Sequence, residues 1–95
     1  MSAVPSDAEL IHASRLEPEA FAPVFDRHYP AIAGFLRRRL DRSLADELAA
    51  ETFLRAFAAR GRYDRSRADA RPWLFGIASH LLARAQRSEV RRLRA

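Results

Sequence analysis

The feature that most constrains the fold of this chain is the apolar pattern of residues 71–95, where apolar side chains recur every three or four positions. This spacing places them on one stripe of an α-helix that can pack against a core. Pro72 suits the first turn of such a helix, because the amide hydrogen that proline lacks has no partner there. The stretch predicts a core-packed helix over residues 72–94, with an inner stripe of Leu74, Ile77, Ala78, Leu81, Leu82 and Ala85.

A second stripe of the same predicted helix is mostly basic. It begins with an aromatic ring and a glycine and continues with one cation after another. Such a face is a candidate surface for nucleic acid, and the alternative is a basic face that is only solvated. Its residues are Trp73, Gly76, His80, Arg84, Arg87, Arg91 and Arg94.

Basic residues are concentrated at one end of the chain. Residues 1–59 hold nine acidic residues and seven arginines, a net charge of −2, whereas residues 60–95 hold ten arginines and three acidic residues, a net charge of +7. This asymmetry is expected of a chain that meets a polyanion through its C-terminal part. All 17 basic residues are Arg, which binds phosphate through two parallel hydrogen bonds, although a GC-rich genome produces the same bias.

The length and composition indicate one small domain without disulfides. A chain of 95 residues with 48% apolar residues is near the lower size at which a helical core suffices. The absence of cysteine excludes disulfides and cysteine-based zinc sites. Because the sequence has no signal peptide and no apolar run of membrane-spanning length, we expect a cytoplasmic protein with no membrane partner.

The sequence lacks the motifs of the common catalytic and metal sites. It has no glycine-rich phosphate loop, no His-Glu-x-x-His, no nucleophile elbow and no Glu-x-x-His pair. The three histidines are far apart in the sequence. We therefore expect no enzyme activity, no catalytic residue, no metal, no cofactor and no small-molecule substrate.

Two helices are predicted in the N-terminal half of the chain. The spacing within Ser6–Glu9 is that of a capping box, which predicts a short helix in residues 6–16. The next helix is predicted to begin near Pro18, with a period of about 3.6 residues. Pro23 and Pro30 interrupt it, and since an interior proline removes a backbone hydrogen bond, we expect this helix to be bent or locally broken.

A third helix and a loop are predicted before the basic helix. Ser43 and Asp46 predict the start of the helix, and Gly61 predicts its end as a C-cap, so that residues 17–60 hold two long helices. Residues 61–71 have no apolar period and predict a loop. The predicted fold class is all-α, a small helical bundle of three main helices plus a short N-terminal helix.

The third helix has an outer stripe that mixes carboxylates with an unexplained leucine. Such a stripe is typical of a docking surface, although single exposed leucines are common. We expect this acidic stripe and the basic face of the last helix to lie on opposite flanks of the bundle. The outer stripe comprises Glu47, Ala50, Glu51, Leu54 and Ala58, with Asp46 beside it, and the name acidic stripe is kept for Glu47, Ala50, Glu51 and Leu54.

Three ordered segments resemble conserved region 2 of bacterial RNA polymerase sigma factors of the extracytoplasmic-function branch. They are ADELAAETFLRAF at residues 45–57, RYD at 62–64 and RPWLFGIA at 71–78. The resemblance extends over about residues 6–94. It implies a single promoter-melting domain that takes part in transcription initiation, in which residues 61–71 form the specificity loop.

The resemblance implies two partners and one possible competitor of both. In this family, the helix corresponding to residues 44–60 docks on the clamp helices of the polymerase β′ subunit, and its contacts map onto the acidic stripe defined above. The other partner is the promoter minus-ten element, held as the non-template single strand. Anti-sigma factors commonly mask these surfaces. Family members continue into a domain that reads the minus-thirty-five element, and the chain ends before it.

By the same resemblance, the loop cups a flipped base and the last helix holds phosphates. Tyr63 and His80 are the rings best placed to stack on bases. Structural alternatives remain for Tyr63, which can close the loop onto the bundle, and for Trp73, which can anchor the core. The implied DNA-binding residues are Tyr63, Arg65, Arg67, Arg71, His80, Arg84, Arg87 and Arg91.

Two other functions fit part of the pattern. A small helical regulator of duplex DNA would place the last helix in a major groove, but such units have a tight turn between their final two helices. About ten residues separate them here. A protein-interaction bundle with a solvated basic face is the second alternative.

Overall fold

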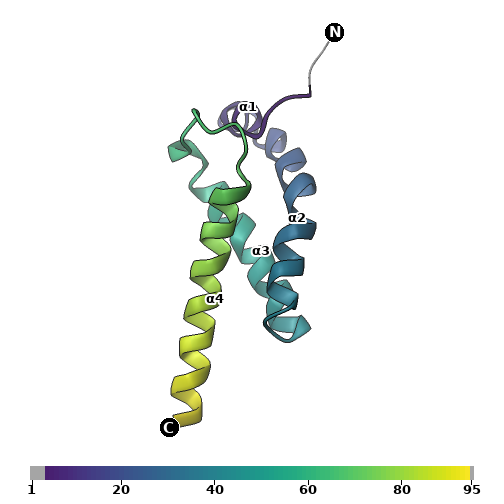
Figure 1. Cartoon of the computed structure of the whole chain (residues 1–95). Helices are drawn as coiled ribbons and strands as arrows, with labels where there is room; N and C mark the ends of the chain where they lie inside the picture. Colours follow the sequence, from purple (N-terminus) through teal and green to yellow (C-terminus); the bar gives the residue numbers. More distant parts are fainter. Residues whose placement is uncertain (1–3, 95) are drawn as a thin grey trace.

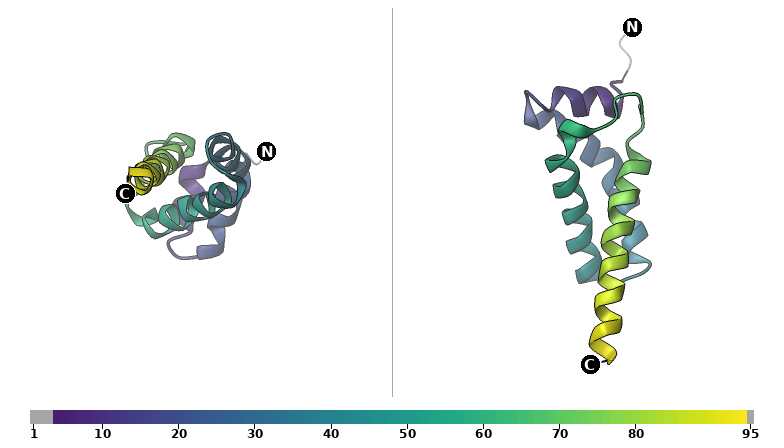
Figure 2. Two further views of the ribbon diagram at one scale, coloured as in Figure 1. Left: turned by 90° about the horizontal axis from the view of Figure 1, so that it is seen from below. Right: turned by 90° about the vertical axis from the view of Figure 1, so that its left-hand side faces the viewer.

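The computed structural model describes residues 4–94, and all of their regular secondary structure is helical. Three helices run alongside one another, and a short helix crosses one end of the bundle (Figure 1, Figure 2). The all-α prediction of three main helices and a short N-terminal one is confirmed. The elements are α1 (Asp7–Ala13), the 3₁₀ turn η1 (Pro18–Phe21), α2 (Ala22–Arg37), α3 (Arg42–Ala58), the 3₁₀ turn η2 (Arg60–Arg62) and α4 (Arg71–Arg94).

The capping box predicted for the first helix is confirmed. The Glu9 amide donates to Ser6 Oγ at 3.1 Å, and the Ser6 amide donates to Glu9 Oε1 at 3.3 Å. Two amides that the first turn would leave without partners are thereby satisfied. This reciprocal pair starts α1 at Asp7, so the carboxylate of Asp7 lies in the first turn of the helix.

The prolines of the second helix lie mostly where they are harmless. Pro18 opens η1, and Pro23 lies in the first turn of α2, where no amide hydrogen is needed. The chain changes from 3₁₀ to α-helix after Phe21, which precedes both prolines that the prediction named. Pro30 is exposed and lies inside α2, yet the helix continues through it to Arg37.

Both predicted ends of the third helix are wrong. Asp41, not Ser43, is the N-cap: its Oδ1 atom accepts from the Leu44 amide at 3.0 Å, so α3 begins at Arg42. Asp46 forms an ion pair with Arg37 at 2.8 Å instead of capping. Asp41 prevails because its extended backbone aims the carboxylate at the free amides.

The helix ends at Ala58, before the predicted glycine C-cap. Gly61 lies within η2. No residue among 4–94 has a positive φ angle, so Gly61 does not form the left-handed cap that glycine favours. The 3₁₀ turn instead ends α3 through backbone bonds, with the Arg62 amide donating to the Ala59 carbonyl at 2.9 Å.

The core lies between the three main helices and ends before α4 does. The inner stripe of α3 includes Ala45, Ala49 and Ala56, whose small side chains let the neighbouring helices approach closely. Every described residue of α4 from Gln86 onward is exposed, and this part of the helix extends beyond the bundle (Figure 1). Within residues 4–94, no helix is both long and apolar enough to cross a membrane. The main buried side chains are Val24, Ile32, Leu36, Phe53, Leu74, Ala78 and Leu82.

Candidate nucleic-acid interface

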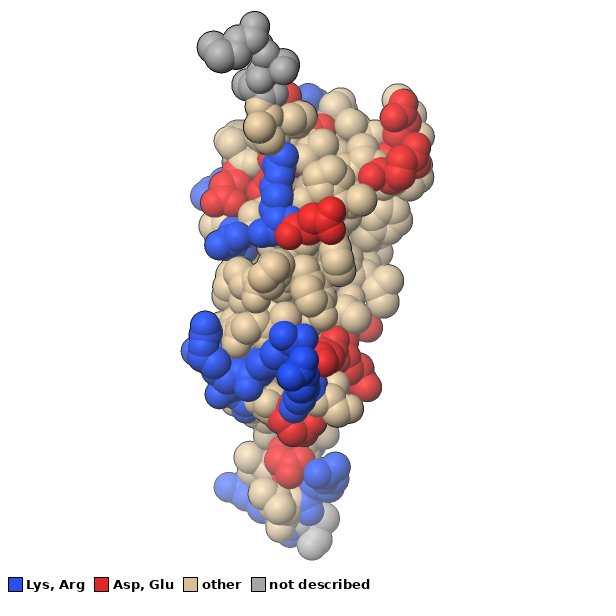
Figure 3. All heavy atoms as spheres, turned by 90° about the vertical axis from the view of Figure 1, so that its right-hand side faces the viewer, with Lys and Arg blue, Asp and Glu red and all other residues tan. Residues whose placement is uncertain are grey.

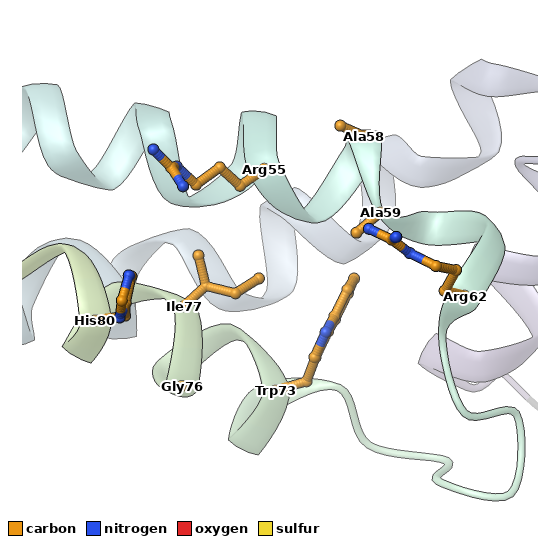
Figure 4. Close-up of a pocket in the computed structure, with 8 residues that line it drawn as sticks. All are labelled: Arg55, Ala58, Ala59, Arg62, Trp73, Gly76, Ile77 and His80. Carbon is orange, nitrogen blue, oxygen red and sulfur yellow. The ribbon is translucent and has the colours of Figure 1, made fainter.

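A groove of about 640 Å³ lies between the end of α3 and the start of α4. Trp73, Ile77 and His80 project from α4 toward α3, and Arg55 and Arg62 lie at the groove from the facing side (Figure 4). The groove combines an indole ring and apolar walls with two guanidinium groups. This combination can hold an unstacked base and its phosphate. The remaining lining residues are Ala58, Ala59 and Gly76.

Two aromatic rings are in contact beside the groove, at the start of α4. Tyr63 meets Trp73 edge-on, with ring centroids 4.8 Å apart. The Tyr63 hydroxyl donates to the Arg67 carbonyl at 2.7 Å. Burial, with nearby Asp7 and other carboxylates, raises the pKa of Tyr63, so the hydroxyl remains a donor. Tyr63 thus closes the loop onto the bundle, as its structural alternative predicted, and its role in DNA binding stays a prediction.

The acidic side chains of the loop brace its backbone. Asp64 Oδ1 accepts from the Ser66 hydroxyl at 2.7 Å and from the Ser66 amide at 3.0 Å. These hydrogen bonds lower the pKa of Asp64. Asp69 Oδ1 accepts from the Arg71 amide at 2.9 Å, at the start of α4. Arg65 and Arg67 are exposed on the same loop, so the loop presents its cations outward.

A buried polar cluster links α1, α2 and the end of the loop. The Asp7 side chain is 5% exposed, and its Oδ2 atom lies 2.7 Å from His28 Nε2 and accepts from the Ala70 amide at 2.7 Å. Arg27 binds Asp7 Oδ1 at 3.0 Å. Arg71 Nε donates to His28 Nδ1 at 3.1 Å. Arg71, predicted to bind DNA, therefore has its guanidinium group held at the cluster by His28 and by the Arg27 carbonyl.

The cluster has the composition of a metal site but is satisfied internally. Ligand atoms of Asp7, His28 and Asp69 lie within 4.8 Å of one another. His28 Nδ1 accepts from Arg71, which places its ring proton on Nε2, directed at Asp7. Burial by itself raises the pKa of Asp7, but the hydrogen bonds from Ala70, His28 and Arg27 outweigh burial and lower it. The chemistry supported by this geometry is a charged hydrogen-bond network that joins three segments.

The predicted acidic and basic faces do not lie on opposite flanks. Glu47 and Glu51 of α3 line one groove of about 470 Å³ together with Arg84 and Arg91 of α4. The cause is the packing of α3 directly against α4, which turns the edge of the acidic stripe toward the basic helix. The prediction of separated faces was therefore wrong.

The rest of the acidic stripe faces outward. Ala50 is exposed, and Leu54 is 66% exposed. Glu51 forms an ion pair with Arg55 at 2.9 Å. This pair joins the acidic stripe to the groove that contains Trp73, because Arg55 lines both grooves.

Arginines also gather at the far end of α2. Arg37 binds Asp46 at 2.8 Å, and Arg42 lies 3.8 Å from the same carboxylate. Arg39 lies over the Phe35 ring at 4.1 Å. On the α2 side of the molecule, basic side chains form a band with acidic ones beside it (Figure 3). Arg37, Arg39 and Arg42 therefore have partners within the fold although they are exposed.

The structure brings together residues that the sequence analysis did not connect. Arg55 and Arg62 line the first groove, although no periodic signal in the sequence indicated that they would face Trp73. Asp7 and His28 meet across 21 positions of the chain. Only the capping box gave a local signal near Asp7, and it indicated a helix start rather than a buried ion.

Comparison with known proteins gives a family match for this chain. Residues 24–92 match the Sigma-70 region 2 family. The chain is similar to RNA polymerase sigma factor CarQ of Myxococcus xanthus, with 38% identity over 72 residues that cover 75% of this chain and 41% of that protein. No solved structure matches. The chain thus spans about two fifths of the length of this relative. Since the matched family covers most of the three main helices, the loop and both grooves, the chain belongs to the sigma-70 region 2 family of transcription initiation factors.

Proposed function

We propose that this domain holds the non-template strand of a promoter minus-ten element while docked on RNA polymerase core. One unpaired base enters the groove between α3 and α4, and the loop of residues 63–70 covers it. The strand continues along α4, and the outer stripe of α3 contacts the clamp helices of the β′ subunit. No bond is made or broken in this function, because capture of the base offsets the few kcal/mol that unstacking and unpairing cost.

The observation that carries the proposal is the groove that contains Trp73. Its apolar walls suit the face of a base, and stacking contributes roughly 1 to 3 kcal/mol per base. Arg55 and Arg62 line the groove and can neutralise the phosphate that accompanies the base. His80 lies at the end of the groove opposite Trp73 (Figure 4), where it can contact the next base.

A row of cations extends from this groove along α4. Arg84, Arg87 and Arg91 are exposed and recur at intervals of three and four residues, so they share one side of the helix. Arginines in such a row bind successive phosphates without reading sequence. Each phosphate contact releases condensed counterions, which makes the affinity fall as the salt concentration rises.

The connection between α3 and α4 disfavours the duplex-binding alternative. A helix-turn-helix unit needs a tight turn, so that its second helix can enter a major groove. Here Ala59, η2 and residues 63–70 separate the two helices. α4 also packs along α3, so the side of α4 that faces α3 is not free to enter a major groove.

A comparison of single-stranded and duplex DNA tests the proposal. A fluorescent single strand is selected from a random-sequence pool for the tightest binding, and its affinity is compared by anisotropy with that of the same strand annealed to its complement. We expect the single strand to bind at least about tenfold more tightly, equivalent to about 1.4 kcal/mol. Equal or tighter binding of the duplex contradicts the proposal and supports the duplex-binding alternative.

A further inference from the structure

We infer that Asp7 is a positioning residue for base capture: α1, through Asp7 and His28, fixes the end of the loop of residues 63–70 and the start of α4. The inference rests on the proposed function, because it assumes that this loop and the neighbouring groove hold an unpaired base. The Asp7 side chain is 5% exposed, so it has no access to a strand. Any effect of Asp7 on binding must pass through the residues that it holds.

The end of the loop is tied to α1 at two backbone positions. Asp7 Oδ2 accepts from the Ala70 amide at 2.7 Å, although 63 positions separate the two residues in the chain. The Ala8 amide donates to the Ala68 carbonyl at 3.2 Å. α1 and the loop occupy the same end of the bundle (Figure 2), and together they line two hollows there. The loop end is therefore a fixed support rather than a free linker.

His28 carries the influence of Asp7 to α4. The single ring proton of neutral His28 points from Nε2 to Asp7 at 2.7 Å, which leaves Nδ1 to accept from Arg71 Nε at 3.1 Å. The carboxylate accepts but cannot donate, so it selects this tautomer. If Asp7 lost its charge, only Arg71 would still select this tautomer, and a side chain at position 7 that donates to Nε2 would move the ring proton to Nδ1, where it opposes the Arg71 donor.

The charged groups around His28 come from every element that packs on it. Asp7 lies on α1, Arg27 precedes the histidine on α2, Asp69 lies near the end of the loop and Arg71 begins α4. Two carboxylates and two guanidinium groups thus surround one ring. These contacts fasten the end of the loop and the start of α4 to α1 and α2, next to the buried Ala70.

The held segment leads directly to the groove. Trp73 lies two positions after Arg71, on the first turn of α4, and forms part of the groove. At the other end of the loop, Tyr63 contacts the same indole edge-on. A displacement of the loop end therefore changes the position of the Trp73 ring and the width of the entrance, while Arg84 and Arg87 farther along α4 remain in place.

The test compares Asp7→Asn with the matched control Asp26→Asn. Asp26 is exposed on α2, and within residues 4–94 its side chain makes no hydrogen bond or ion pair, so the control makes the same chemical change without the network. The probe is the selected fluorescent single strand, together with versions that carry an abasic site at each position in turn. The measured quantity is the affinity ratio between the intact strand and its most weakly bound abasic version.

We expect Asp7→Asn to lower this ratio about tenfold, the contribution of roughly one charge-assisted hydrogen bond, and Asp26→Asn to leave it unchanged. The salt dependence should stay the same in both variants, because the phosphate contacts on α4 are untouched. If the affinities of Asp7→Asn for the intact and the abasic strands fall by the same factor, the inference is contradicted and Asp7 is a purely structural residue. If no abasic site lowers the affinity of the wild-type protein for the strand, the proposed function itself fails.

A pair of His28 variants keeps the inference testable if Asp7→Asn does not fold. His28→Gln keeps an N–H donor for Asp7, whereas His28→Leu removes both the donor and the acceptor. Circular dichroism first verifies that each variant is helical. We expect the base-to-abasic ratio to survive in His28→Gln and to fall in His28→Leu. Equal ratios in the two variants contradict the role of His28 as a link between Asp7 and α4.

Discussion

Asp7 combines a capped helix start with a buried charge. It occupies the first turn of α1, where a carboxylate is favoured by the helix dipole. It also accepts hydrogen bonds from α2 and from the end of the loop. A buried carboxylate with this many donors stabilises the fold only while it is ionised, so the residue couples the stability of the domain to pH.

The lowered pKa of Asp7 predicts acid sensitivity. The folded pKa lies below the ordinary value of 3.8, so the unfolded chain binds the proton more readily. The stabilisation from Asp7 is therefore complete above about pH 5 and is lost as the pH falls through the folded pKa. We expect Asp7→Asn to lower the free energy of unfolding by about 2 kcal/mol at pH 7, with a smaller difference from the wild type at pH 3, measured by urea denaturation.

The two halves of α4 differ in burial. Leu74, Ala78 and Leu82 bury its first half in the core, whereas its described residues from Gln86 onward are exposed. The first half therefore has a fixed position, and the exposed half depends on helix propensity and on local ion pairs such as Glu89–Arg92 at 2.6 Å. The predicted phosphate contacts Arg84 and Arg87 lie near the boundary, where the helix is still anchored.

Removal of the cations at this boundary should change the salt dependence of single-strand binding by a defined amount. Arg84→Ala and Arg87→Ala together should weaken single-strand binding and reduce the slope of log affinity against log salt by about one unit per lost phosphate contact. Fluorescence anisotropy over a range of salt concentrations measures the slope. Arg38→Ala, at the exposed end of α2, is the matched control and should leave the slope unchanged. An unchanged slope in the double variant would remove these residues from the interface.

At the scale of the whole molecule, both proposed partners approach the α3–α4 side. Glu47 and Glu51 share a groove with Arg84 and Arg91. The electrostatic field of the carboxylates therefore acts on the guanidinium groups, and the reverse also holds. The carboxylates reduce the positive potential that a DNA strand meets along α4. Electrostatic coupling over such short distances is only weakly screened by salt, and the two binding surfaces cannot be changed independently.

Charge reversal at Glu51 tests this coupling. Glu51→Arg should weaken binding to RNA polymerase core, because it removes a proposed contact to the clamp helices. It should also raise single-strand affinity at low salt, because it adds a cation beside Arg84. Glu19→Arg in η1 introduces the same charge at an exposed position and is the control for both measurements. Unchanged binding to core would argue against the docking surface, and unchanged DNA binding would argue against the coupling.

The site could be predicted only in part from the sequence. The motif around Trp73 indicated that the start of α4 is part of the site, and the row of arginines indicated which side of this helix is exposed. Arg55 and Arg62 could not be assigned to the groove, because their orientation depends on where α3 ends, and the glycine at position 61 indicated a cap that does not form. Arg71 was expected to be free for DNA but is held by His28.

What the sequence by itself determined is local: the helices, the capping box of α1 and the apolar stripe of α4 follow from spacings within a few turns, where periodicity decides which side chains share a face. What only the tertiary structure decided is which faces meet. The crossing of α3 and α4 placed the acidic stripe beside the arginines. Asp7 and Ala70 became partners across 63 positions, because burial of the core brought their segments together and a buried carboxylate must find donors.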